Sequence, residues 1–148
     1  MESVRIIIQG GPIAQESAVE SCHECGALIE FLGIVRGIED ARSITGLEYT
    51  AYEPMAQRVL ETIAQEMIAR FEISRIRAEH SRGFVPVGAC SFRLCVGAPH
   101  RKEALLAVGE FIDRMKEDVP IWKAAVFQDG VQEKPVEQTV EQEDVYRS

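Results

Sequence analysis

The sequence has little of what membrane proteins and nucleic-acid-binding proteins require. No apolar run approaches the roughly 18 residues of a membrane-spanning helix, and the N-terminus lacks the basic start and long apolar core of a signal peptide. Lys and Arg number 16 against 24 Asp and Glu, which gives a formal net charge of −8. A general nucleic-acid binder would need a basic surface instead. We therefore expect a cytoplasmic protein, in which any cluster of cations is informative because it opposes the overall charge.

Several motifs of cofactor-dependent enzymes are also missing. There is no Walker-type loop, no G-x-G-x-x-G and no H-E-x-x-H. Cys22 and Cys25 have the C-x-x-C spacing of a zinc knuckle or a redox pair, but a zinc site normally needs a second such pair. Cys90 and Cys95 lie five residues apart in a strand-like segment, where alternation places them on opposite faces. We expect no metal or organic cofactor and interpret the cysteines as reduced thiols, with a zinc-binding module as an alternative.

The length of 148 residues predicts one domain over residues 1–148, in which residues 137–148 form a loose acidic tail. Period-2 alternation and short glycine-bounded apolar runs predict strands over 4–8, 27–36, 46–53, 73–82, 89–97 and 121–127. Apolar residues at helical spacing predict two long helices that begin at Pro54 and at Pro99, each proline in a first turn. This order predicts an α+β fold with a mainly antiparallel sheet.

Three further expectations concern the less regular parts of the chain. Residues 13–25 have sparse apolar spacing that allows a short helix. Residues 37–45 lack periodicity and suggest an exposed loop, and residues 83–88 suggest a turn-rich connection. The buried stripe of the second long helix is predicted to consist of Leu105, Val108, Ile112 and Met115.

The segment Ala98–Phe127 concentrates cations in this acidic chain. His100 and Arg101 fall in the first turn of the second helix, where free backbone N–H groups favour an anion. Lys116 closes the same helix about 24 Å away, at about 1.5 Å per residue. One small anion therefore cannot reach both ends of one straight helix. Either the ligand is extended or a second copy of the chain supplies one end of the site, whereas Lys116 and Lys123 flank a short turn and can meet.

These cations suit chemistry on anionic reactants. A lysine near other cations and away from water loses proton affinity and can act as an acid or base near neutral pH. The planar guanidinium of an arginine suits phosphate. Structural roles remain open as alternatives: Lys116 as a cation that stabilises the helix dipole, and His100 and Lys123 as solvated surface residues.

Five segments in order resemble the catalytic (large) subunit of molybdopterin synthase over roughly residues 26–127. They are Ile29-Glu-Phe-Leu-Gly-Ile-Val-Arg36, Leu47-Glu-Tyr-Thr-Ala-Tyr-Glu-Pro-Met55, Ala98-Pro-His-Arg-Lys-Glu-Ala104, Met115-Lys116 and Val119-Pro-Ile-Trp-Lys123. The resemblance implies an α/β hammerhead-type fold. It also implies a homodimer whose two ends each bind one small ubiquitin-like sulfur-carrier subunit, giving a heterotetramer.

The resemblance further implies an activity in molybdenum cofactor biosynthesis. The C-terminal Gly-Gly thiocarboxylate of the carrier delivers sulfur to cyclic pyranopterin monophosphate and so forms the molybdopterin dithiolene. Lys116 is implied as the main catalytic lysine, with Lys123 assisting and positioning the tail of the carrier. The residues implied to line the substrate pocket are Arg36, His100 and Arg101, with Phe31 near it.

A non-catalytic paralogue is the alternative function. Such a protein would bind a ubiquitin-like partner or a pterin without turnover. Ala124-Ala125 follows Lys123 in this chain, whereas a charged pair that includes Glu commonly follows in the family.

Overall fold

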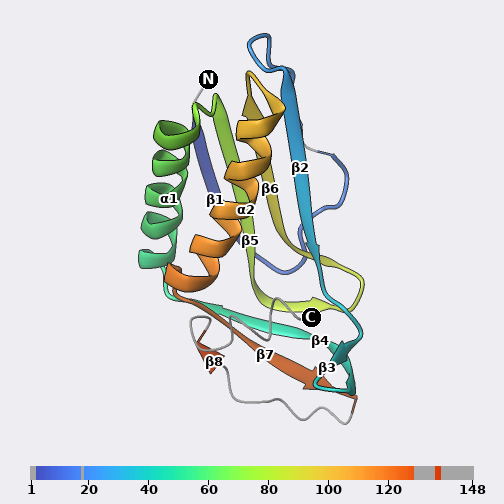
Figure 1. Ribbon diagram of the computed structural model, residues 1–148. Helices are drawn as coiled ribbons and strands as arrows, with labels where there is room; N and C mark the ends of the chain where they lie inside the picture. The colour runs from blue at the N-terminus through green and yellow to red at the C-terminus, as the bar shows by residue number, and fades with distance from the viewer. Residues whose placement is uncertain (1–2, 18, 129–135, 138–148) are drawn as a thin grey trace.

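A computed structural model describes residues 3–17, 19–128 and 136–137. Within these residues, eight strands form one sheet and two helices cover one of its faces (Figure 1). The strands are β1 (Val4–Gly10), β2 (Ala27–Ile34), β3 (Ile38–Glu39), β4 (Arg42–Ala51), β5 (Arg75–Pro86), β6 (Cys90–Ala98), β7 (Ile121–Phe127) and β8 (Val136–Glu137). The helices are α1 (Met55–Phe71) and α2 (Arg101–Asp118). Neither helix is both long and apolar enough to cross a bilayer.

The sheet follows the order β2-β6-β5-β4-β7-β8, with β1 added beside β5 and β3 beside β4. All described pairings are antiparallel except that of β1 with β5, so the predicted α+β class with a mainly antiparallel sheet is confirmed. Strand β5 pairs with β6 over residues 75–80 and with β4 over residues 83–86. Strands β4 and β7 therefore cross below the helices, and the C-terminal end of α2 lies where these two parts of the sheet meet (Figure 1).

Helix α1 begins directly after Pro54 and buries the apolar face that its spacing predicts, with Leu60, Ile63 and Met67 in the main core. The helix α2 is as predicted, but its buried face is correct only in part. Its fully buried residues are Ala104, Ala107, Phe111 and Met115, and Val108 and Ile112 of the predicted stripe are partly buried against the same core. Alanine side chains let the helix approach the sheet closely, and the ring of Phe111 stacks on that of Phe92 with 6.4 Å between centroids. The larger Leu105 stays outside this contact and is 60% exposed.

The predicted short helix in residues 13–25 is wrong, because no described residue of this range is helical. The segment instead lies against the sheet. The backbone N–H of Ile13 donates to the carbonyl of Cys90 at 2.8 Å. The buried guanidinium of Arg93 donates to the carbonyls of Ala14 and Glu16, which a helix would have used internally.

The predicted loop at residues 37–45 is a β-hairpin of β3 with the start of β4. Asp40 and Ala41 occupy its two turn positions with φ of 50° and 62°. Such a left-handed pair suits the right-handed twist of a two-residue hairpin. Residues 83–86, predicted as part of a turn-rich connection, continue β5 instead, and the described turn is confined to Val87 and Gly88. The chain beyond Gln128 lies outside the described residues except for β8, so the predicted tail is not described.

Candidate functional site

The end of α2 brings two lysines together. The last turn of the helix carries Lys116, and the N–H of Val119 donates to the carbonyl of Met115 at 3.1 Å as the helix ends. Buried Val119 and Ile121 anchor the reversal at Pro120 into β7. Lys123, the third residue of β7, then lies close enough to Lys116 for the two charges to interact. The turn at Pro120 therefore places the two lysines near each other, as their positions in the sequence allow.

Lys116 has the electrostatics expected of a group that exchanges a proton near neutral pH. Burial against the sheet, assisted by the positive charge of Lys123, lowers the pKa of Lys116 to about 8. Both causes act against the ammonium form. Around neutral pH the Lys116 side chain is therefore still mostly protonated, yet it releases its proton far more readily than a solvated lysine.

Lys123 has a carboxylate partner that sequence analysis missed. Its Nζ lies 3.7 Å from Oε1 of Glu39, and the two side chains are only 16% and 17% exposed. Glu39 is the last residue of β3, in the segment predicted to be a loop. The hairpin of β3 and β4 is what carries Glu39 to β7, and no local pattern of the sequence indicates this contact.

The floor of the lysine site is formed by neutral polar side chains from three strands. Tyr49 of β4 is the cross-strand neighbour of Lys123, and its Oη lies 2.9 Å from Oγ of Ser91. Burial is the main cause that raises the pKa of Tyr49 to about 12. The ring of His80 packs edge-on against Tyr49 with 5.2 Å between centroids. The phenol of Tyr49 therefore remains protonated beside the lysines.

His80 is also neutral at physiological pH. Its Nδ1 lies 2.8 Å from the carbonyl oxygen of Ser81, so Nδ1 carries the hydrogen and donates. Burial, together with the charge of Lys116, lowers the pKa of His80 to about 4. The positive charge of this site therefore resides on the two lysines, with Glu39 as the carboxylate beside them.

The other predicted site residues lie elsewhere in the chain. His100 and Arg101 are exposed at the N-terminal end of α2, about 24 Å from Lys116 at about 1.5 Å per helical residue. Arg36 is exposed on the connection between β2 and β3 that leads to Glu39. Phe31 of β2 is 39% exposed, and its ring centroid lies 6.1 Å from that of Phe92. Within one chain, the structure unites the lysines but does not bring His100 and Arg101 to them.

Comparisons with known proteins identify the family of this chain. The family model described as MoaE protein matches residues 8–118. The chain belongs to this family. Molybdopterin synthase catalytic subunit 1 of Aedes aegypti is 42% identical over 110 residues, which are 73% of this chain and 71% of that protein.

Two solved structures of related proteins have the same fold. Molybdopterin synthase from Staphylococcus aureus superposes with a TM-score of 0.77 at 32% identity, covering 90% of this chain and 98% of that one. The complex of subunits 1 and 2 of molybdopterin-converting factor from Helicobacter pylori gives a TM-score of 0.69 at 28% identity, covering 92% and 90%. The resemblance inferred from the sequence is confirmed.

The cysteines of this MoaE-family chain differ from their predicted state. Cys22 and Cys25, expected as reduced thiols, form a disulfide. A turn in which the N–H of Cys25 donates to the carbonyl of Cys22 brings their Cα atoms to 5.3 Å, within the range that a disulfide spans. Cys90 and Cys95 are free thiols. Among the residues that the structure describes, no three His, Cys, Asp or Glu side chains are grouped as a metal site would require.

Proposed function

We propose that this protein transfers sulfur from the C-terminal thiocarboxylate of a small ubiquitin-like carrier subunit to cyclic pyranopterin monophosphate, forming the dithiolene of molybdopterin in molybdenum cofactor biosynthesis. The observation that carries the proposal is the Lys116–Lys123 pair in a member of the MoaE family. The donor carries a thiocarboxylate and the acceptor a phosphate. Two anions must therefore meet, and a pocket without cations would repel both.

The two lysines have different roles in this proposal. Lys116 in its ammonium form stabilises the negative charge that develops at the carrier's carbonyl as sulfur is transferred. Because its pKa is about 8, it can also give up and regain a proton during the cycle. Lys123, oriented by Glu39, attracts and positions the carrier's anionic tail. Lys116 is thus the main catalytic residue and Lys123 the assisting one.

The carrier is the proposed protein partner. The Helicobacter pylori relative, which shares the fold, is a complex of two subunits of molybdopterin-converting factor. For this chain we propose that the carrier's extended Gly-Gly tail enters beside Lys123 and ends at Lys116. An extended tail is suitable because only its terminal group needs to reach the lysines.

A homodimer would complete the site. Arg101, Leu105, Val108, Ile112 and Lys116 follow one another at steps of three or four residues, so they form one stripe along α2. This stripe lies away from α1, which contacts the opposite side of α2 through the ion pairs of Arg70 with Glu110 and of Glu66 with Arg114. In the apolar middle of the stripe, the side chain of Leu105 is 60% exposed to solvent.

The charged residues at the two ends of this stripe would come together if a second copy of the chain packed against it. An antiparallel copy of α2, with the two-fold axis near Val108 and Gly109, would cover the apolar middle. It would also set Arg101 of one protomer near Lys116 of its partner, because both lie seven or eight residues from that axis. We propose that His100 and Arg101 bind the substrate phosphate in this shared site, with Arg36 and Phe31 along its edge.

Reconstitution tests the function. Wild-type protein, Lys116→Ala and Lys102→Ala are each supplied with thiocarboxylated carrier and cyclic pyranopterin monophosphate, and molybdopterin is measured. Lys102 is the matched control because it is exposed on α2 outside the stripe. We expect product from wild type and Lys102→Ala and a loss of at least about a hundredfold in Lys116→Ala. Wild type that binds the carrier without forming product would instead establish a non-catalytic paralogue.

Mixed protomers test the shared site. Arg101→Ala and Lys116→Ala are each expected to be inactive alone, because each variant lacks a residue from a different half of the shared site. Refolding the two together creates heterodimers in which one of the two sites has both residues intact. Recovery of part of the activity on mixing is expected, whereas no recovery would show that each protomer uses only its own residues.

A further inference from the structure

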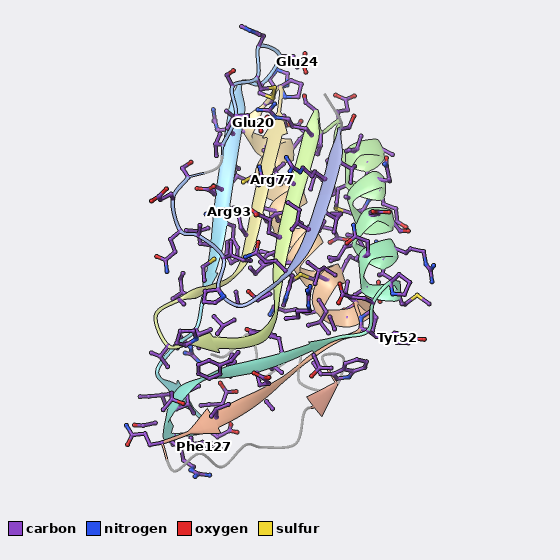
Figure 2. The ribbon with its side chains drawn as sticks, turned by 180° about the vertical axis from the view of Figure 1, so that it is seen from behind. Glu20, Glu24, Tyr52, Arg77, Arg93 and Phe127 are labelled. Atoms are coloured by element: carbon purple, nitrogen blue, oxygen red, sulfur yellow. A yellow bond between two sulfur atoms is a disulfide. The ribbon has the colours of Figure 1, made fainter. Side chains whose placement is uncertain are left out.

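A second cluster of cations lies on the sheet face turned away from the helices. Val4, Ile6 and Ile76 pack into the helix-covered core, so the alternating residues Arg5, Arg75 and Arg77 point to the opposite face. Figure 2 shows Arg77 and Arg93 on this face, with Glu20 above them. The lysine site lies at the lower end of the helix-covered side. The two groups of cations are therefore separate.

The arginines line a cavity between the sheet and the N-terminal connecting segment. It encloses about 270 Å³, near the lower end of the range for small-molecule sites. Val19 and Glu20 of the connecting segment form one wall, and Leu28 contributes an apolar side chain. Leu28 is 41% exposed, so its side chain is accessible to a ligand in this cavity.

Gly97 lets Cys25 and Leu28 pack closely against β6 at the upper end of this cavity. A Cβ atom at Gly97 would lie 2.9 Å from Sγ of Cys25 and 3.1 Å from Cδ2 of Leu28, so a larger residue there would collide with both neighbours. The turn closed by the Cys22–Cys25 disulfide thus lies directly over the rim. The connecting segment is held in place at the rim by this turn and further along by the bonds of Arg93 to the carbonyls of Ala14 and Glu16.

Two arginines of the cavity carry like charges on adjacent strands. Arg5 and Arg77 are direct neighbours across the parallel pairing of β1 with β5, an arrangement of like charges that disfavours the strand pair. Arg75, the third arginine of the lining, donates to the backbone carbonyl of Glu20. Glu79, the partner of Arg77 at 3.5 Å, is shared with the buried Arg93 at 3.2 Å. Nε of Arg77 is buried and has no hydrogen-bond partner among the described residues.

We propose that this cavity binds a small organic anion with an apolar body, and that its carboxylate, sulfonate or phosphate group lies between Arg5 and Arg77. An anion there would relieve the repulsion between the two guanidinium groups. Its apolar body would contact Leu28 and Val19 and reduce their exposure. This site is independent of the sulfur-transfer chemistry, because it lies on the other face of the sheet.

A pair of matched probes tests the proposal. 8-Anilinonaphthalene-1-sulfonate has an apolar body and one anionic group, and N-phenyl-1-naphthylamine is its uncharged relative. In a titration of ¹⁵N-labelled protein, we expect the sulfonate to shift the amide signals of Arg5, Leu28, Arg77 and Gly97. We expect it to bind at least about tenfold more tightly than the neutral probe, because one charge-assisted contact of this kind corresponds to about a tenfold change.

Substitutions identify the contribution of the arginines. Arg5→Gln is expected to weaken sulfonate binding about tenfold and to leave the neutral probe unaffected. Arg58→Gln is the matched control, since Arg58 is exposed on α1 away from this cavity, and Lys116→Ala excludes binding at the lysine site. Equal affinity for both probes, unchanged binding by Arg5→Gln, or shifts confined to Leu105 and Leu106 of α2 would each overturn the proposal.

Discussion

Lys123 of β7 and Glu39 of β3 form an ion pair with 3.7 Å between Nζ and Oε1, and both side chains are largely buried. The pair connects the candidate catalytic lysines to the hairpin of β3 and β4. It also places a carboxylate next to the position at which we propose that an anionic tail binds. Glu39 therefore orients Lys123 and, at the same time, competes with the tail for its charge.

Glu39→Gln should strengthen binding of the anionic carrier. The amide keeps a hydrogen-bond acceptor near Lys123 but removes the competing negative charge. We expect the KM for the thiocarboxylated carrier to fall about two- to tenfold, the range of one partly screened charge interaction. Glu53→Gln is the matched control, since Glu53 pairs with the exposed Arg82 at 3.8 Å. A higher KM with a lower kcat would show instead that the orientation of Lys123 matters more than competition.

The pH dependence of turnover should report on Lys116. Its pKa is about 8, and the proposed role requires the ammonium form, so kcat should fall as the pH rises from 7 to 9. In Lys116→Arg the side chain stays charged over this range, and the profile should be flat with a lower maximum. Molybdopterin formation at saturating carrier is the measurement. A kcat that rises through pH 8 would indicate that the neutral amine acts as a base.

His80 should make the protein sensitive to acid. Its pKa is about 4 in the folded state against an ordinary value of 6.5, so between these values the unfolded chain binds a proton that the folded chain does not. The free energy of unfolding therefore falls as the pH decreases from 6.5 to 4, by about 3 kcal/mol at most. In His80→Gln this part of the decrease should disappear. Urea denaturation at several pH values is the measurement.

The matched control for His80→Gln is His23→Gln, which removes an exposed imidazole from the N-terminal connecting segment. The comparison uses the slope against pH, because the loss of buried packing at position 80 lowers stability at every pH. Parallel curves for wild type and His80→Gln would contradict the prediction.

The apolar stripe of α2 should control assembly and activity together. Leu105→Asp places a charge in the middle of the proposed dimer contact and should give a monomer without activity. Leu106→Asp is the matched control, because Leu106 is 51% exposed on a different side of the same helix. Sedimentation velocity measures the oligomeric state, and circular dichroism verifies the fold. An unchanged oligomer in Leu105→Asp would locate the contact elsewhere.

The local pattern of apolar residues and prolines was sufficient to predict most of the helices and strands. Helix α1, strands β2, β6 and β7, and the start of α2 follow from apolar periodicity and from proline positions, which depend only on near neighbours in the chain. Prediction from the local pattern failed where residues distant in sequence bind the backbone groups that a local element would have used. Arg93 binds the carbonyls of Ala14 and Glu16, which a helix would need for its own hydrogen bonds. Residues 38–43 form a hairpin whose turn has no Gly or Asn to indicate it.

The stripe of α2 illustrates the same division. Leu105, Val108 and Ile112 have the spacing of a buried face, but Ala104, Ala107 and Phe111 form a second face that packs more closely on the sheet. Periodicity identifies both faces as apolar. Packing against β6 buries the second face fully, whereas Val108 and Ile112 remain partly buried and Leu105 is exposed.

The sequence by itself determined the family and the α+β class, because these depend on residue types in a fixed order, and it predicted Lys116 and Lys123 as the catalytic lysines. The tertiary structure decided their chemistry. Burial and the neighbouring charge that lower the pKa of Lys116, the contact of Glu39 with Lys123 and the neutral His80 beneath them all depend on strands distant in sequence. Desolvation and Coulomb interactions act through space, so spacing along the chain does not predict their strength.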